Sequence, residues 1–68
     1  SMINLEAERR RLQKEIEQSQ AEVTRLEARL KDRAFLTKAP TAIVDREQNK
    51  LAIRKDKLER LKQQLERF

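Results

Sequence analysis

The chain of 68 residues contains no cysteine, histidine, glycine, tryptophan or tyrosine, and it has a single proline. Without cysteine, the chain cannot form a disulfide, a zinc thiolate site or a cysteine nucleophile. Without histidine, it lacks the commonest metal ligand and the usual general base. The lack of glycine excludes a Gly-rich phosphate-binding loop. We therefore expect no catalytic residue, no metal site and no cofactor site within this chain.

Long apolar runs are also missing. No stretch approaches the ~20 consecutive apolar residues of a membrane-spanning helix, and no secretory signal is present. We expect a cytoplasmic protein, or a piece of one, without a membrane partner. The opening Ser1-Met2 is typical of a cloning scar, so we expect the natural segment to cover residues 3–68.

The composition favours either a long helical structure or disorder. Charged residues make up 43% of the chain, hydrophobic residues 37% and aromatic residues 3%. A chain rich in Ala, Glu, Lys, Leu and Arg is typical of coiled coils, but low hydrophobicity combined with high charge is also typical of disordered segments. The spacing of the apolar residues decides between the two.

Apolar residues recur with the a and d spacing of a heptad repeat in both halves of the chain. In the first half these positions are Leu5, Leu12, Ile16, Val23, Leu26 and Leu30, with Arg9 and Ser19 as polar interruptions. In the second half they are Val44, Leu51, Leu58, Leu61, Leu65 and Phe68, with Glu47 and Arg54 as polar interruptions. The spacing predicts two helices, over about 3–32 and 40–68.

The lone proline predicts a reversal of the chain between these helices. Pro40 cannot continue a helix from the residues before it, but it suits the first position of a new one. We therefore expect a turn over residues 33–39. If the chain folds back there, seam residues whose numbers add to 73 or 74 lie opposite each other, from Leu30 with Val44 to Leu5 with Phe68. Every such layer joins an a to a d position, which predicts an all-α, two-helix antiparallel coiled-coil hairpin.

The net charge of +5 is concentrated in the second half. Residues 1–32 hold seven basic and seven acidic residues, whereas residues 33–68 hold ten basic and five acidic residues. At about 100° per residue, a group of basic residues falls within one sector roughly 140° wide on the second helix. Its members are Arg46, Lys50, Arg54, Lys57, Arg60 and Arg67.

We call Arg46, Lys50, Arg54, Lys57 and Arg60 the basic ridge, and it suits contact with a phosphate backbone. The alternative is structural: these cations can pair with acids of the first helix, such as Glu15 or Glu22, and cover the seam with their stems. Two readings also exist for the turn, where Phe35 lies near Lys38. Phe35 either stacks on an exposed base pair or plugs the end of the seam.

Essentially the whole chain after Ser1-Met2 resembles a known family. The matching residues are Ile3-Asn4-Leu5-Glu6-Ala7-Glu8-Arg9, Arg11-Leu12-Gln13-Lys14-Glu15-Ile16, Phe35, Lys38-Ala39-Pro40, Val44, Glu47, Lys50-Leu51, Leu61 and Leu65. With these residues the chain resembles the C-terminal coiled-coil arm of bacterial valyl-tRNA synthetases. The turn from Phe35 to Val44 is the most specific part of the resemblance.

The resemblance implies a piece of a class I aminoacyl-tRNA synthetase that joins valine to its tRNA with ATP. The arm of that family contacts the outer corner of the tRNA, so we expect the valine-specific tRNA as partner and the basic ridge, Lys38 and Phe35 as RNA-binding residues. Catalysis and ATP binding would lie outside this chain. Two alternatives stay open: the coiled-coil arm of a ribosome-associated ABC-type ATPase, and a purely structural spacer. Because the core is short, we also expect weak self-association.

Overall fold

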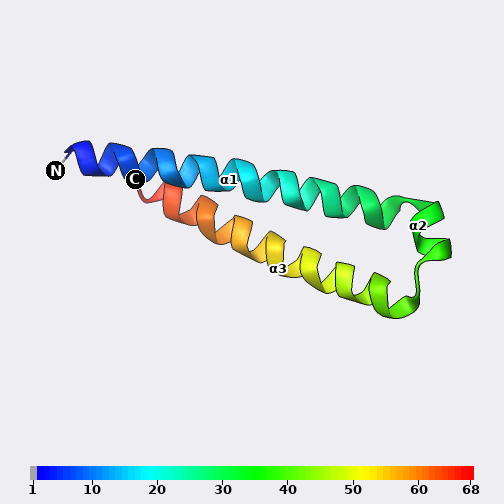
Figure 1. Cartoon of the computed structure of the whole chain (residues 1–68). Coiled ribbons are helices and arrows are strands. Elements are labelled where there is room, and N and C mark those ends of the chain that lie inside the picture. The colour runs from blue at the N-terminus through cyan, green and yellow to red at the C-terminus, as the bar shows by residue number, and fades with distance from the viewer. Residues whose placement is uncertain (1) are drawn as a thin grey trace.

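The computed structural model describes the backbone of residues 2–68 and the side chains of residues 4–68. Three helices follow one another along the chain, namely α1 (Met2–Lys31), α2 (Arg33–Lys38) and α3 (Thr41–Glu66). The long helices α1 and α3 run antiparallel, and α2 crosses one end of the rod (Figure 1). This arrangement confirms the predicted all-α hairpin. The cloning scar proposed for Ser1-Met2 includes Ser1, which lies outside the described residues.

Both long helices form because their interiors contain no glycine or proline and are filled with strong helix formers. Arg29 and Lys31 occupy the last turn of α1, where positive charge is favourable next to the negative end of the helix dipole. The molecule measures 53 × 15 × 13 Å along its principal axes. It is a rod in which any ligand contact must be made along a side or at an end.

The segment 33–39, expected to be a turn, instead contains the short helix α2. The physical reason is Asp32, which has an extended backbone (φ −76°, ψ 112°) and so ends α1. Its side-chain Oδ1 accepts a hydrogen bond from the backbone N–H of Ala34 at 3.0 Å. An aspartate in this position caps a helix by satisfying one of its unpaired N–H groups. One residue therefore stops the first helix and starts the next.

Pro40 separates α2 from α3 as its chemistry requires. Ala39 is extended (φ −77°, ψ 139°), the conformation favoured for a residue before proline. The Pro40 carbonyl accepts hydrogen bonds from the N–H groups of Ile43 and Val44, at 2.9 and 3.1 Å. The helix begins at Thr41, one residue later than predicted, and Pro40 occupies the cap position without a side-chain hydrogen bond.

The core lies along the middle of the interface between α1 and α3. Its buried apolar side chains are Leu12, Val23, Leu26, Leu58 and Leu61. Two polar residues, Ser19 and Glu47, are buried among them. Every buried residue in residues 4–68 is therefore one of the predicted a or d positions. The layer at the open end is weaker, because Leu5 and Phe68 are more than half exposed.

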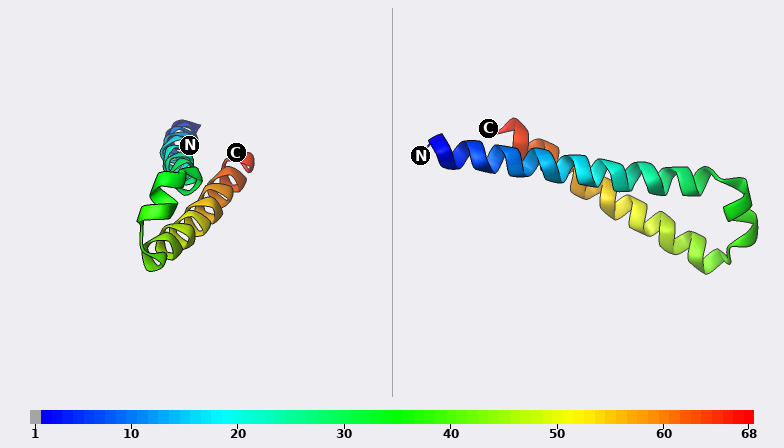
Figure 2. Two further views of the ribbon diagram at one scale, coloured as in Figure 1. Left: turned by 90° about the vertical axis from the view of Figure 1, so that its right-hand side faces the viewer. Right: turned by 45° about the horizontal axis from the view of Figure 1, so that its top comes forward.

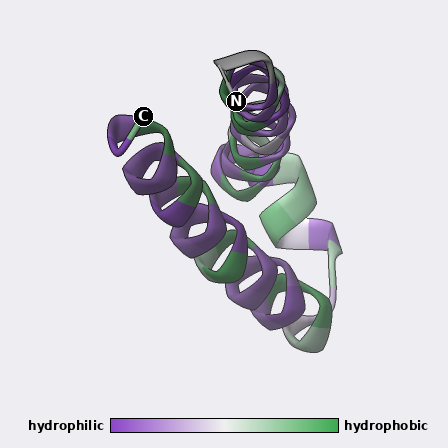
Figure 3. Ribbon diagram, turned by 90° about the vertical axis from the view of Figure 1, so that its left-hand side faces the viewer, coloured by the Kyte–Doolittle hydropathy of each residue, from purple (hydrophilic) through white to green (hydrophobic). Residues whose placement is uncertain are grey.

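The long helices diverge toward α2, as the two views of Figure 2 show. Hydrophilic residues cover most of the outer faces of both (Figure 3). Because α2 crosses the end of the rod, α1 and α3 are held apart there, and polar side chains can line the space between them. No helix within residues 2–68 combines the length and the hydropathy needed to cross a bilayer.

Candidate nucleic-acid interface

The basic ridge lies along one side of α3, mostly in solvent. Arg46, Lys50 and Lys57 are exposed, and none of them forms an ion pair with any described residue. Their spacings of four and seven residues place them on one side of the helix. These three cations therefore remain available to an outside anion.

The other two ridge residues are engaged with carboxylates. The Nε atom of Arg54 lies 3.0 Å from Oε2 of Glu22, so this ion pair joins α3 to α1. Arg54 is half-buried and leaves the seam toward Glu22, next to the layer where Ser19 is buried. Arg60 pairs with Asp56 of its own helix, at 3.0 Å between Nη2 and Oδ2. The predicted pairing with Glu22 thus forms, but it occupies one ridge residue only.

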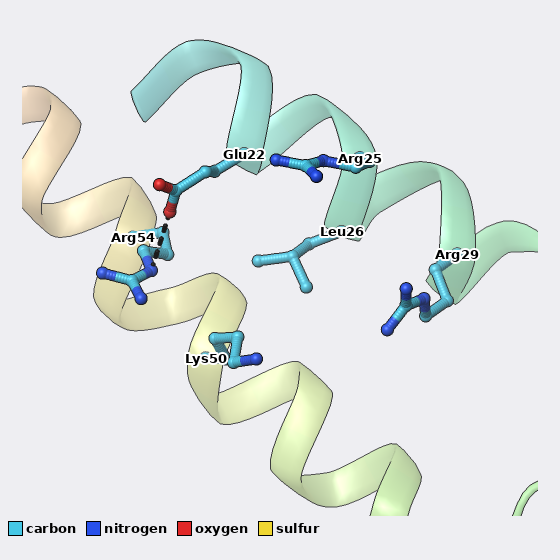
Figure 4. Close-up of a pocket in the computed structure, with 6 residues that line it drawn as sticks. All are labelled: Glu22, Arg25, Leu26, Arg29, Lys50 and Arg54. Atoms are coloured by element: carbon cyan, nitrogen blue, oxygen red, sulfur yellow. Dashed lines mark ion pairs between the residues drawn. The ribbon is translucent and has the colours of Figure 1, made fainter. Parts of the chain in front are cut away.

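Between α1 and α3 lies an open hollow of about 240 Å³, which we call the basic groove. Figure 4 shows the six residues that line it, with side chains from both helices turned toward the space between them. They are Glu22, Arg25, Leu26, Arg29, Lys50 and Arg54. Four are cations and one is an anion, so the lining carries a net charge of +3.

The basic groove suits a phosphate group better than a small apolar ligand. Its only apolar lining residue is Leu26. Arg25 and Arg29 line it from α1, and the Arg29 side chain is turned toward the space between the helices (Figure 4). Arginine binds phosphate oxygens through paired N–H donors, and lysine adds a point charge. Because the hollow is open to solvent, a phosphate group of a larger polyanion can reach it. A backbone of sugar and phosphate fits this geometry.

Arg29 also makes two contacts that fix its place beside the groove. Its Nη1 lies 3.4 Å from Oε1 of Glu47, a buried residue of α3. Its guanidinium carbon lies 5.8 Å from the centre of the Phe35 ring in α2. A cation at this distance from an aromatic ring is attracted to it. Arg29 therefore connects all three helices.

The two site residues predicted in the connection are carried by α2. Phe35 is half-buried, with Arg29 beside its ring, and Lys38 is exposed in the last turn of the helix. Neither lines the basic groove. The predicted site residues thus fall into two places: Lys50 and Arg54 meet in the groove, while Phe35 and Lys38 lie at the end of the rod.

Sequence reasoning missed Arg25 and Arg29. They are four residues apart and so lie on one edge of α1, which was a usable signal. It was overlooked because the charges of residues 1–32 cancel in sum, and because Glu22 lies on the same edge of α1. The excess of positive charge is local, because Arg25 and Arg29 outnumber Glu22 at the part of α1 that lines the groove.

A separate charged cluster lies nearer the open end of the rod, on α1. Arg11 donates two hydrogen bonds to Glu8, at 3.3 and 2.8 Å, and another to Glu15 at 3.0 Å. Hydrogen bonding to the Arg11 guanidinium, reinforced by its charge, holds the pKa of Glu8 below its ordinary value. The charge of Arg11 is thus already balanced on its own helix.

Within residues 4–68, no cluster of His, Cys, Asp or Glu side chains is arranged to hold a metal ion. The acids near the groove already form ion pairs within the chain: Glu22 pairs with Arg54, and Glu47 pairs with Arg29. The groove is therefore a place for an anion.

Comparison with known proteins gives a consistent result. A family model described as "Valyl tRNA synthetase tRNA binding arm" matches residues 4–68. The chain is 47% identical over 62 residues to a valine–tRNA ligase of Dehalococcoides mccartyi, covering 91% of this chain and 7% of that protein. It is 39% identical over 67 residues to the enzyme of Syntrophotalea carbinolica, covering 98% of this chain and 8% of that protein.

A third relative, the valine–tRNA ligase of Corynebacterium glutamicum, is 36% identical over 64 residues, covering 94% of this chain and 7% of that protein. The chain thus spans 7–8% of the length of these relatives. No solved structure gives a significant match. The comparisons give no support to the alternatives of an ABC-type ATPase arm or a structural spacer. The family model covers nearly the whole chain, and the chain belongs to the family of valyl-tRNA synthetase tRNA-binding arms.

Proposed function

We propose that the chain is the tRNA-binding arm of a valine–tRNA ligase and that the basic groove, with the ridge beside it, receives the tRNA backbone. The basic groove carries this proposal, because cations of two helices converge there on a space that no described side chain fills. Phosphate contacts give affinity and orientation with little dependence on base sequence. The arm therefore contributes to the placement of the tRNA.

The proposed partner is the valine-specific tRNA, contacted at the outer corner where the D and T loops meet. Arg46, Lys50, Arg54, Lys57 and Arg60 of α3 line this contact, and Arg25 and Arg29 of α1 join them. Phe35 and Lys38 contact the RNA only if it reaches the α2 end of the rod. Selection of valine tRNA and the use of ATP belong to the remainder of a cytoplasmic ligase.

Weak self-association of the chain is a separate proposal. It is supported by the exposure of Leu5 and Phe68, which line an open hollow of about 640 Å³ at one end of the rod. A second copy that covers these side chains would remove apolar surface from water. Sedimentation velocity over a range of concentrations tests it, and a sedimentation coefficient independent of concentration would exclude it.

The test of RNA binding is fluorescence anisotropy of labelled valine tRNA with the 68-residue chain at several salt concentrations. If about three phosphates are neutralised, log affinity should fall with log salt with a slope of roughly −2 to −3. The double variant Lys50→Glu/Lys57→Glu should lose about tenfold or more in affinity, because it places two carboxylates beside the groove.

The matched control is Lys62→Glu. Lys62 is exposed on the same helix, forms no ion pair with any described residue, and lies about 120° around the axis from Lys50. It should change the affinity by less than about threefold, the effect of net charge alone. The control removes half the charge of the double variant, so the two losses are compared per substitution on a logarithmic scale. Equal logarithmic losses per substitution would show that RNA is held by total charge, without a preferred face.

A further inference from the structure

Glu47 is a buried glutamate whose position in the seam is not explained by a gain in folding stability. It is 9% exposed and occupies a seam position of α3 among apolar side chains. Its Oε1 has one cationic neighbour, Arg29 at 3.4 Å, and its buried Oε2 accepts no hydrogen bond from any described residue. Burying a carboxylate that is only partly satisfied opposes folding. A leucine would complete the seam, so the stability of the seam does not account for a glutamate at this position.

Arg29, which forms the ion pair with Glu47, indicates a role for this glutamate. Arg29 is half-exposed, lines the basic groove, and places its guanidinium beside the Phe35 ring. An unrestrained arginine samples many rotamers, and fixing it upon binding costs conformational entropy. The buried carboxylate of Glu47 restrains Arg29 from the seam side, while Phe35 restrains it from the α2 side. The exposed N–H groups of the guanidinium are then directed into the groove before any ligand arrives.

We propose that Glu47 is a positioning residue, which holds the Arg29 guanidinium at the wall of the basic groove so that it meets a backbone phosphate of the bound RNA. This inference rests on the proposed function, since it assigns a role in binding at the same groove. Glu47 itself does not touch the RNA. It acts through Arg29, at a cost to the stability of the seam.

The sign of the effect on binding separates this role from simple electrostatics. Removing any carboxylate raises the net positive charge, and by charge alone this strengthens binding to a polyanion. If Glu47 positions Arg29, its removal weakens binding in spite of the added positive charge. A residue that served only the fold would give the opposite sign, because Glu47→Leu makes the seam more apolar.

The experiment compares Glu47→Leu and Glu47→Gln with the control Glu59→Gln, an exposed acid of α3 that forms no ion pair with any described residue. Binding of valine tRNA is measured by anisotropy, and the midpoint of thermal unfolding by circular dichroism. We expect a higher midpoint for Glu47→Leu and a loss of about three- to tenfold in affinity for both Glu47 variants. Glu59→Gln should leave the midpoint unchanged and bind as tightly as the unaltered chain or more tightly.

A second readout reports on Arg29 without RNA. The ¹⁵N relaxation of its Nε–Hε group should indicate restricted motion in the unaltered chain and faster motion in both Glu47 variants. Affinity equal to or above that of the unaltered chain in Glu47→Leu overturns the proposal, and so does unchanged relaxation of Arg29. If the unaltered chain fails to bind tRNA, the proposed function is lost, whereas the relaxation of Arg29 still decides whether Glu47 positions it.

Discussion

Glu22 of α1 and Arg54 of α3 form an ion pair of 3.0 Å across the hairpin, at the wall of the basic groove. The pair joins the two long helices, and it also neutralises one of the four cations that line the groove. Its side chains are 42% and 38% exposed, so water screens it. The ion pair therefore stabilises the fold slightly and weakens the attraction of the groove for an anion.

Removing the Glu22 carboxylate should lower the stability of the fold slightly and strengthen tRNA binding. Glu22→Gln should lower the free energy of unfolding by about 0.2–1 kcal/mol, the usual value of a partly exposed ion pair. It should strengthen tRNA binding by about two- to fivefold, because Arg54 is released to face the groove. Urea unfolding and anisotropy measure the two effects. Glu17→Gln is the control, an exposed acid of α1 without an ion pair to any described residue, and its effect on affinity should be smaller.

Burial predicts which apolar residues maintain the hairpin. Leu58 is 6% exposed, so Leu58→Ala should lower the free energy of unfolding by about 2–3 kcal/mol through lost burial and the cavity left behind. Ile53 of the same helix is 66% exposed, and Ile53→Ala should change the free energy of unfolding by less than about 0.5 kcal/mol. Urea unfolding followed by circular dichroism compares the two. Similar losses in both variants would mean that α3 does not pack on α1 with the face that the structure shows.

The cap of α2 can be tested locally. Asp32→Ala removes the acceptor of the Ala34 N–H group and should cost α2 about 1 kcal/mol of local stability. The amides of Leu36 and Ala39 should then exchange with solvent several times faster. The midpoint of global unfolding should hardly move, because α2 contains no buried residue. Asp32→Asn keeps an acceptor oxygen and should restore slow exchange; failure to do so would argue against capping.

The pKa of Glu8 gives a prediction about acid pH. Since the hydrogen bonds from Arg11 lower this pKa in the folded chain, Glu8 stabilises the fold at pH values above its ordinary, unfolded pKa. That contribution disappears as the pH falls through the lower, folded pKa. Carbon-13 NMR of the Glu8 carboxyl should record a midpoint below the ordinary range, and Arg11→Gln should return it to that range. An unchanged midpoint in this variant would exclude Arg11 as the cause.

The sequence predicted the long helices well because their signal repeats over many turns. Each a and d position adds the same information, so Leu12, Val23, Leu58 and Leu61 identify the buried face together. The connection depended on single residues. The start of a helix at residues 33–38 depends on the hydrogen bond that the Asp32 side chain accepts from the Ala34 N–H group, and a local bond of this kind competes closely with an open turn.

Of the four cations that line the basic groove, the sequence indicated only the two on α3, for a related reason. The ridge on α3 follows from the periodicity of one helix, so Lys50 and Arg54 could be found. The groove requires two helices at a known register and separation, and the separation depends on α2 crossing the end of the rod. Arg25 and Arg29 belong to the site only because α3 lies beside them.

The most direct test of the basic groove is an NMR titration of the ¹⁵N-labelled 68-residue chain with valine tRNA. The prediction is that signals of Arg25 and Arg29 in α1 move together with those of Lys50 and Arg54 in α3, at the same RNA concentration. Signals of Lys55 and Lys62, on the other edge of α3, should stay in place. Movement confined to that other edge, with the four groove residues unaffected, would contradict the account.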